Sequence, residues 1–140
     1  MTGAGIVLMG SRSQTLIGAS DAEVAVAEQW HFTIGEDPYR VAFDRGAPVV
    51  AHESALRRHF VELHRRLRRH TPFRSVAVLP LGDDSTRVGV VAFYFDESFP
   101  TAGFDVQAAR PVARAMHAEL LAATPPRPRP APPRPAPPRP

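Results

Sequence analysis

The sequence predicts an α+β protein, in which residues 1–124 form an antiparallel sheet of about five strands flanked by helices. Three observations predict this class. Runs of β-branched and aromatic residues come in pairs joined by short polar connections, which is typical of hairpins rather than of a parallel sheet. Segments with helical features separate these pairs. Residues 125–140 are so rich in proline and arginine that they predict a disordered tail outside the domain.

The first elements are a hairpin and a short helix. The runs Ile6–Met9 and Thr15–Ala19 are β-prone, and the polar residues 10–14 between them suit a turn. Ser20 or Asp21 can cap a helix over Ala22–Gln29, because a short oxygen side chain satisfies free amides of the first turn.

The next helix has clear signals at both ends. Asp37 is a good N-cap, and Pro38 suits the first helical position. Gly46 suits the left-handed backbone conformation that ends many helices. We therefore predict a helix over Pro38–Arg45, with a short strand at Val49–Ala51 after it.

One helix is predicted over Ser54–His70, because its apolar residues recur at helical spacing. These residues are Leu56, Phe60, Leu63 and Leu67. Ser75–Leu81 and Arg87–Phe95 then predict a central hairpin. A last helix follows, which Pro111 must kink or begin. Its predicted buried stripe is Ala109, Val112, Ala113, Met116 and Leu120.

The charge of the chain is unevenly distributed. The formal net charge is +3, and all 17 basic residues are arginine. Four of them lie in residues 125–140, which leaves 13 arginines against 14 acidic residues in the first 124. Because the predicted domain is nearly neutral, the basic total does not by itself indicate nucleic-acid binding.

The residue types argue against several function classes. The chain has no cysteine, which excludes disulfides, thiol nucleophiles and zinc thiolate sites. His59, His64 and His70 fall on different helical faces, so we expect no metal site. No carboxylate pair or serine stands in a catalytic pattern, and we expect a protein that is not an enzyme. No segment predicts a signal peptide or a membrane span, and we expect a cytoplasmic location.

Three stretches carry a resemblance to a known family. They are WHFTIGEDPY at residues 30–39, RGAPVV at residues 45–50, and RSVAVLPL at residues 74–81 with VGVV behind it. Together they resemble a GAF domain, in particular those of actinobacterial regulators that carry an RNA-binding antitermination domain called ANTAR. The family pattern Gly-Glu-Gly-Pro-Cys reads Gly-Glu-Asp-Pro-Tyr here, so Tyr39 replaces the usual thiol. The likeness covers residues 5–123, and the sequence shows no ANTAR segment after it.

The resemblance implies a curved sheet in PAS-like strand order 2-1-5-4-3, with a small-molecule pocket between the sheet and the connecting helices. It also implies a regulatory role in signal transduction, exerted through a homodimer or a partner protein at the last helix. No cofactor is expected, because cyclic-nucleotide-binding relatives carry lysine and asparagine and the bilin-binding and methionine-sulfoxide-reducing relatives need cysteine, all absent here. The ligand stays unknown. The ligand-binding residues that we expect are Trp30, Phe32, Glu36, Tyr39, Phe43 and Phe60.

An alternative is binding of nucleic acid or another anionic surface, in a transcription-regulating role. The predicted helix Ser54–His70 is basic opposite its apolar stripe. Its arginines are Arg57, Arg58, Arg65, Arg66, Arg68 and Arg69. Glu53 and Glu62 stand one turn from Arg57 and Arg66 and can pair with them, which favours a solvated face. The Arg/Pro tail belongs to the same alternative, because its arginines can contact an anionic surface. The tail also favours polyproline II and suits an SH3-like partner domain, although a passive tail is as good an interpretation.

Overall fold

The computed structural model describes residues 3–11, 13–34, 37–97, 104–123 and 135–139, except for the side chains of residues 30–34. It confirms the α+β class, with a five-stranded antiparallel sheet in the order β2-β1-β5-β4-β3. The strands are β1 Gly3–Met9, β2 Gln14–Ala19, β3 Val49–Ala51, β4 Ser75–Leu81 and β5 Gly89–Phe95. The helices are α1 Ala22–Ile34, α2 Pro38–Arg45, α3 Glu53–His59, α4 Val61–His70 and α5 Val106–Ala123.

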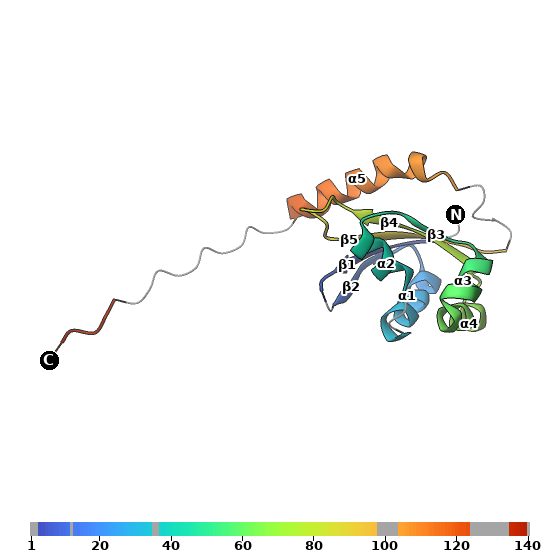
Figure 1. Cartoon of the computed structure of the whole chain (residues 1–140), viewed down its shortest axis with the longest axis horizontal. Coiled ribbons are helices and arrows are strands. Elements are labelled where there is room, and N and C mark those ends of the chain that lie inside the picture. The colour runs from blue at the N-terminus through green and yellow to red at the C-terminus, as the bar shows by residue number, and fades with distance from the viewer. Residues whose placement is uncertain (1–2, 12, 35–36, 98–103, 124–134, 140) are drawn as a thin grey trace.

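The sheet separates two apolar layers. Helices α1–α4 lie on one face, and α5 lies across the other (Figure 1). Strand β5 is buried along its whole length, because it pairs with β1 and β4 and is covered on both faces. Alternate strand residues therefore enter different layers: Val78 and Tyr94 pack under α1–α4, whereas Leu79 and Phe93 pack under α5.

Strand β1 and helix α1 are longer than the sequence predicted by several residues, whereas β2 begins one residue earlier than predicted and β5 begins two residues later, at Gly89 instead of Arg87. Strand β1 begins at Gly3 because its residues 3–8 pair with β5, where Gly3 is opposite Tyr94. Helix α1 continues to Ile34 and so includes the backbone of residues 30–34. The glycine-rich start of β1 and the weakly amphipathic end of α1 give little local signal for a strand or a helix. The lengths of both elements therefore depend on the elements that pack against them.

Helix α2 confirms its predicted boundaries. Asp37 has an extended backbone, and its carboxylate accepts a hydrogen bond of 2.9 Å from the Tyr39 amide. Gly46 adopts φ +64° and donates its amide to the Ala42 carbonyl, which ends the helix. Both ends are thus determined by local hydrogen bonds.

The predicted single helix over Ser54–His70 is wrong, because the structure has two helices separated by Phe60. The Phe60 backbone leaves the helical region, with φ −135° and ψ 55°, and serves as the end of α3 and the start of α4. Its amide still donates to Leu56, and its carbonyl accepts from His64. The apolar spacing survives such a bend, since Leu56, Leu63 and Phe60 all pack on the core. Spacing alone therefore could not show the break.

The stripe predicted for the last helix is correct except at Val112. Ala109 and Ala113 are buried, and Met116 and Leu120 are half-buried against the sheet. Val112 is 46% exposed, because α5 rests mainly on β4 and turns this side away from it. Pro111 lies inside the helix rather than at its start.

The described part of the tail, residues 135–139, is exposed and has no regular secondary structure. The rest of the predicted tail lies outside the described residues.

Candidate functional site

A polar cluster is buried between the sheet and helices α1 and α2. The Tyr94 hydroxyl donates to the Glu28 carboxylate over 2.9 Å, and the Tyr39 hydroxyl contacts both groups. Glu28 is 4% exposed and both tyrosines are fully buried. Gly5 makes room for the carboxylate, since a Cβ there would lie 2.8 Å from Glu28 Oε1.

The environment of this cluster keeps both phenols neutral. Burial raises the pKa of Tyr39 well above its usual value, and the neighbouring Tyr94 and Glu28 groups raise it further. Burial also raises the pKa of Tyr94, with the negative charge of Glu28 as the next cause. The two neutral phenols therefore donate hydrogen bonds to the buried carboxylate of Glu28. Because Glu28 is buried, its charge is not exposed to a ligand.

A groove of about 660 Å³ opens nearby, between α2, β3 and α3. Its apolar surface comes from Val41, Val49, Val50, Ala51, Ala55 and Phe60. Its polar surface comes from Asp37, Arg40, Arg45 and His59. All three residues of β3 line it, and β3 is an edge strand that pairs with β4 and with no other strand of the described residues. The groove therefore combines an apolar floor with a strand edge that can hydrogen bond.

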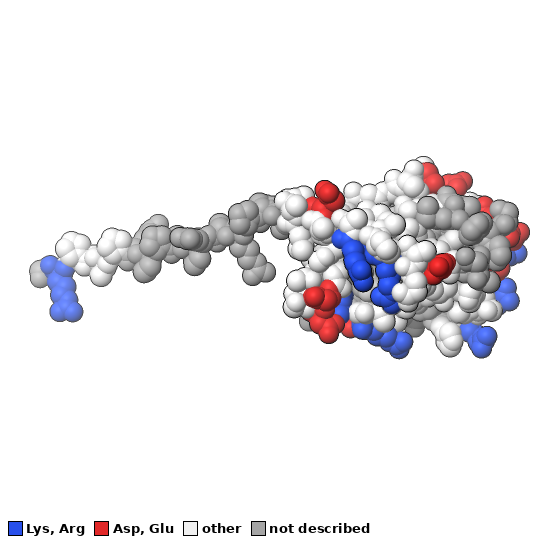
Figure 2. All heavy atoms as spheres, turned by 90° about the horizontal axis from the view of Figure 1, so that it is seen from above, with Lys and Arg blue, Asp and Glu red and all other residues white. Residues whose placement is uncertain are grey.

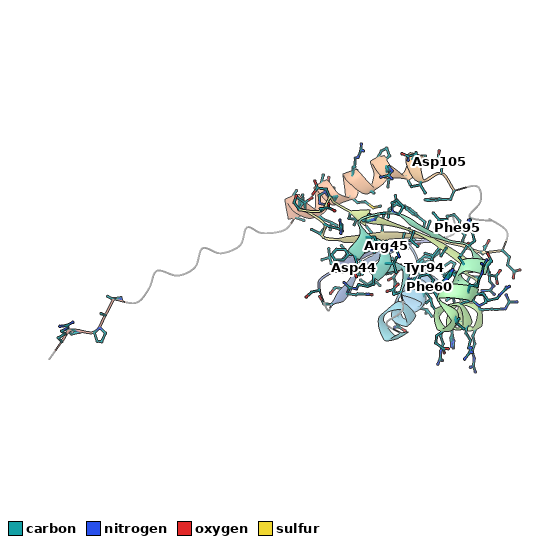
Figure 3. The ribbon with its side chains drawn as sticks, viewed as in Figure 1. Asp44, Arg45, Phe60, Tyr94, Phe95 and Asp105 are labelled. Atoms are coloured by element: carbon teal, nitrogen blue, oxygen red, sulfur yellow. The ribbon has the colours of Figure 1, made fainter. Side chains whose placement is uncertain are left out.

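The two arginines of the groove have different surroundings. Arg40 donates to the Gly10 carbonyl over 2.8 Å and lies 3.8 Å from the Asp44 carboxylate. Arg45 is exposed at the last turn of α2 and makes no ion pair within the described residues. Arg45 and Phe60 both lie on the α1–α4 side of the sheet (Figure 3). Arg45 is thus the cation best placed to meet a negatively charged group at the groove rim.

The structure distributes the predicted ligand-binding residues over different places. Phe60 lines the groove, whereas Tyr39 is fully buried in the core. Phe43 is half-buried, with the guanidinium carbons of Arg40 and Arg87 at 5.7 and 5.8 Å from its ring centre. The side chains of Trp30 and Phe32, together with Glu36, lie outside the described residues.

The sequence reasoning did not select β3, Arg45 or His59, which the groove brings together with Phe60. The available signal was the Arg45-Gly46 pair at a predicted helix end next to a short strand. Such a pair indicates where the chain turns but not which surface it meets.

The basic face of α3 and α4 is partly neutralised by two carboxylates. Glu53 pairs with Arg57 at 3.6 Å and Arg68 at 3.1 Å, and a hydrogen bond from His64 lowers the pKa of Glu53.

Glu62 pairs with Arg65 at 3.2 Å and with Arg66 at 3.5 Å. The predicted pairs of Glu53 with Arg57 and of Glu62 with Arg66 are confirmed. Arg58 and Arg69 are exposed and have no ion pair in the described part of the chain.

The strand order and the helices on both faces place the chain in the PAS-like and GAF-like class of folds. No protein-family model matches the sequence, and no curated protein matches it. The structure is similar to the GAF domain of a two-component sensor histidine kinase from Bacillus halodurans, with a TM-score of 0.51 and 12% identity. The match covers 86% of this chain and 82% of that chain. The chain therefore has the GAF fold, as the resemblance predicted.

Across the described residues, no helix is both long and apolar enough to cross a bilayer.

Proposed function

We propose that this protein is a sensory or regulatory GAF-like module that binds a small molecule in the groove between α2, β3 and α3. The groove carries the proposal: its volume of about 660 Å³ lies within the range of roughly 300–1,000 Å³ that is typical of ligand sites. Its mainly apolar lining, with a few polar groups at the rim, is also typical of such sites. No catalytic step is part of the proposal.

The composition of the groove favours an apolar ligand that bears a negative group. Val49, Ala51 and Phe60 offer apolar surface, and Arg45 offers a cation at the rim. The interior next to the groove is a poorer site, because Tyr39, Tyr94 and Glu28 already fill it. Ligand contacts by Trp30, Phe32, Glu36, Tyr39 and Phe43 stay predictions.

Ala55→Trp tests the proposal, because this half-buried residue of α3 lines the groove and a large ring there would fill it. The control is Ala118→Trp, at an exposed position of α5 outside the groove. We expect the fluorescent probe 1-anilinonaphthalene-8-sulfonate to bind the wild type and the control alike. We expect at least about a tenfold loss of affinity in Ala55→Trp. Equal affinity in all three proteins would contradict the assignment of the groove.

We further propose that the module signals as a homodimer through α5. Val112 on this helix, which lies across one face of the sheet, is 46% exposed, and Ile17 on the edge strand β2 is 42% exposed. Ile6 on β1 is half-buried on the same face. A second copy would cover this apolar surface. Val112→Glu should shift sedimentation from dimer to monomer, and a wild type that sediments as a monomer would refute the dimer.

The second candidate is binding of nucleic acid through α3 and α4. Arg58 and Arg69 favour it, since they are exposed cations without an ion pair among the described residues. If it is correct, affinity for RNA falls steeply between about 50 and 200 mM salt, and Arg58→Gln with Arg69→Gln weakens binding. Affinity that does not depend on salt would exclude this candidate. Docking of the tail on an SH3-like domain stays a prediction.

A further inference from the structure

A second hollow lies on the other face of the sheet, beside α5. Its volume is about 430 Å³, and its walls are the α2–β3 connection, the β4–β5 hairpin and α5. Helix α5 contributes Arg110, Ala113, Arg114 and His117 to the lining. No lining residue is shared with the groove between α2, β3 and α3, so the two are separate sites.

The side of α5 that faces this hollow is basic. Arg110, Arg114 and His117 follow one another at spacings of four and three residues, which places them on one side of the helix. Val112 is exposed on the opposite flank, and the buried alanines of the helix lie between the two flanks. Val112 and the three basic residues therefore lie on different sides of α5.

The positive charge of the hollow exceeds the negative charge of its lining. Neither Arg110 nor Arg114 forms an ion pair with a described residue, and like charges one helical turn apart repel each other. Asp83 is the one acidic residue among the described residues of the lining. Its Oδ1 accepts hydrogen bonds from the amide and hydroxyl groups of Ser85 and Thr86, which hold it in the hairpin turn. Figure 2, viewed from the α5 side, shows basic side chains together in the middle of this face.

Contacts between the hairpin and α5 give the hollow its shape. His117 Nε2 lies 2.9 Å from the Thr86 carbonyl oxygen, to which it donates a hydrogen bond. Gly82, with φ +103°, permits this approach, because a Cβ there would lie 2.7 Å from His117 Nε2. Pro48 and Pro80 add rigid apolar wall. The two arginines therefore line the hollow, and the hydrogen bond of His117 holds the β4–β5 hairpin against α5.

We propose that this hollow binds a small organic phosphate monoester. A phosphate monoester carries a charge of about −1.5 to −2 at neutral pH, which matches two guanidinium groups, whereas a carboxylate matches one. Guanidinium groups bind phosphate oxygens in a bidentate manner, and two of them one turn apart can share one phosphate. A volume of about 430 Å³ also holds a small organic body against Leu79 and the prolines.

The test compares two pairs of substitutions with the same loss of charge. Arg110→Gln with Arg114→Gln changes the hollow, and Arg65→Gln with Arg68→Gln changes two α4 arginines that already pair with Glu62 and Glu53, as the control. The probes are phenyl phosphate, benzoate and phenol, followed by NMR chemical shifts. We expect phenyl phosphate to bind the wild type with a Kd of about 1 mM or below, with shifts at the Gly82 and Thr86 amides.

The expected result is at least about a tenfold weaker Kd for phenyl phosphate in the α5 pair, and no change in the α4 pair. Equal weakening in both pairs would overturn the proposal, because binding would then follow net charge alone. Benzoate that binds as tightly as phenyl phosphate would overturn the phosphate class. Absence of shifts in the wild type would overturn the site. Binding of the naphthalene sulfonate in the other groove is measured separately, so failure of one site leaves the other to be judged alone.

Discussion

Tyr94→Phe tests whether the buried polar cluster contributes to stability. Phenylalanine keeps the ring, its burial and its contact with Phe73, whose ring centre lies 4.8 Å from that of Tyr94. The substitution therefore removes only the hydroxyl, which donates to Glu28 and contacts Tyr39. A hydrogen bond to a carboxylate contributes about 1.5–3 kcal/mol, and we expect the free energy of unfolding to fall by about 2 kcal/mol.

Urea unfolding measures this loss, and an unchanged dependence on urea concentration would show that the unfolded state is the same. Tyr39→Phe and the double substitution complete a mutant cycle. Because both hydroxyls share Glu28, we expect a coupling free energy of about 0.5–3 kcal/mol. A Tyr94→Phe protein within about 0.5 kcal/mol of the wild type, or strictly additive losses, would refute the reasoning.

Three other predictions concern the backbone and the pH dependence. Gly46→Ala should cost about 1–2 kcal/mol in urea unfolding, since φ is +64° and a Cβ would overlap Arg87. Gly18→Ala, where nothing lies within 4 Å of an added Cβ, should change stability by less than about 0.5 kcal/mol, and an equal loss at both sites would contradict this account. Because the pKa of both buried tyrosines is raised in the folded state, their contribution is complete below the usual pKa of 10.0 and is lost as pH rises above it. Stability of the double phenylalanine variant should therefore fall less between about pH 9 and 11, and parallel curves would exclude this cause. Asp37→Ala should cost about 1 kcal/mol while Asp37→Ser keeps the cap, and equal losses would speak against the cap.

Sequence reasoning succeeded where short-range rules apply. The hairpin strands and the boundaries of α2 depend on residues within a few positions, such as Asp37 and Gly46. The pairs of Glu53 with Arg57 and of Glu62 with Arg66 also follow from helical spacing. The GAF resemblance added the strand order, which no local pattern contains.

The candidate site was only partly predictable. Phe60 was expected at a ligand site and lines the groove, but its neighbours Arg45, His59 and β3 come from separate segments. Tyr39 was expected at the same site, yet packing placed its ring in the core beside Tyr94. An aromatic residue carries the same sequence signal in a pocket wall and in a core.

The sequence by itself determined the α+β class, the caps of α2, the absence of thiol chemistry and most positions of the apolar stripes of the helices, because each depends on residue type or on regular spacing. Only the tertiary structure decided the bend at Phe60, the exposure of Val112 and the two hollows. These features arise where segments far apart in the chain meet, such as the β4–β5 hairpin with α5. The free energy that stabilises these features comes from contacts between the segments. The sequence of one segment alone therefore does not predict them.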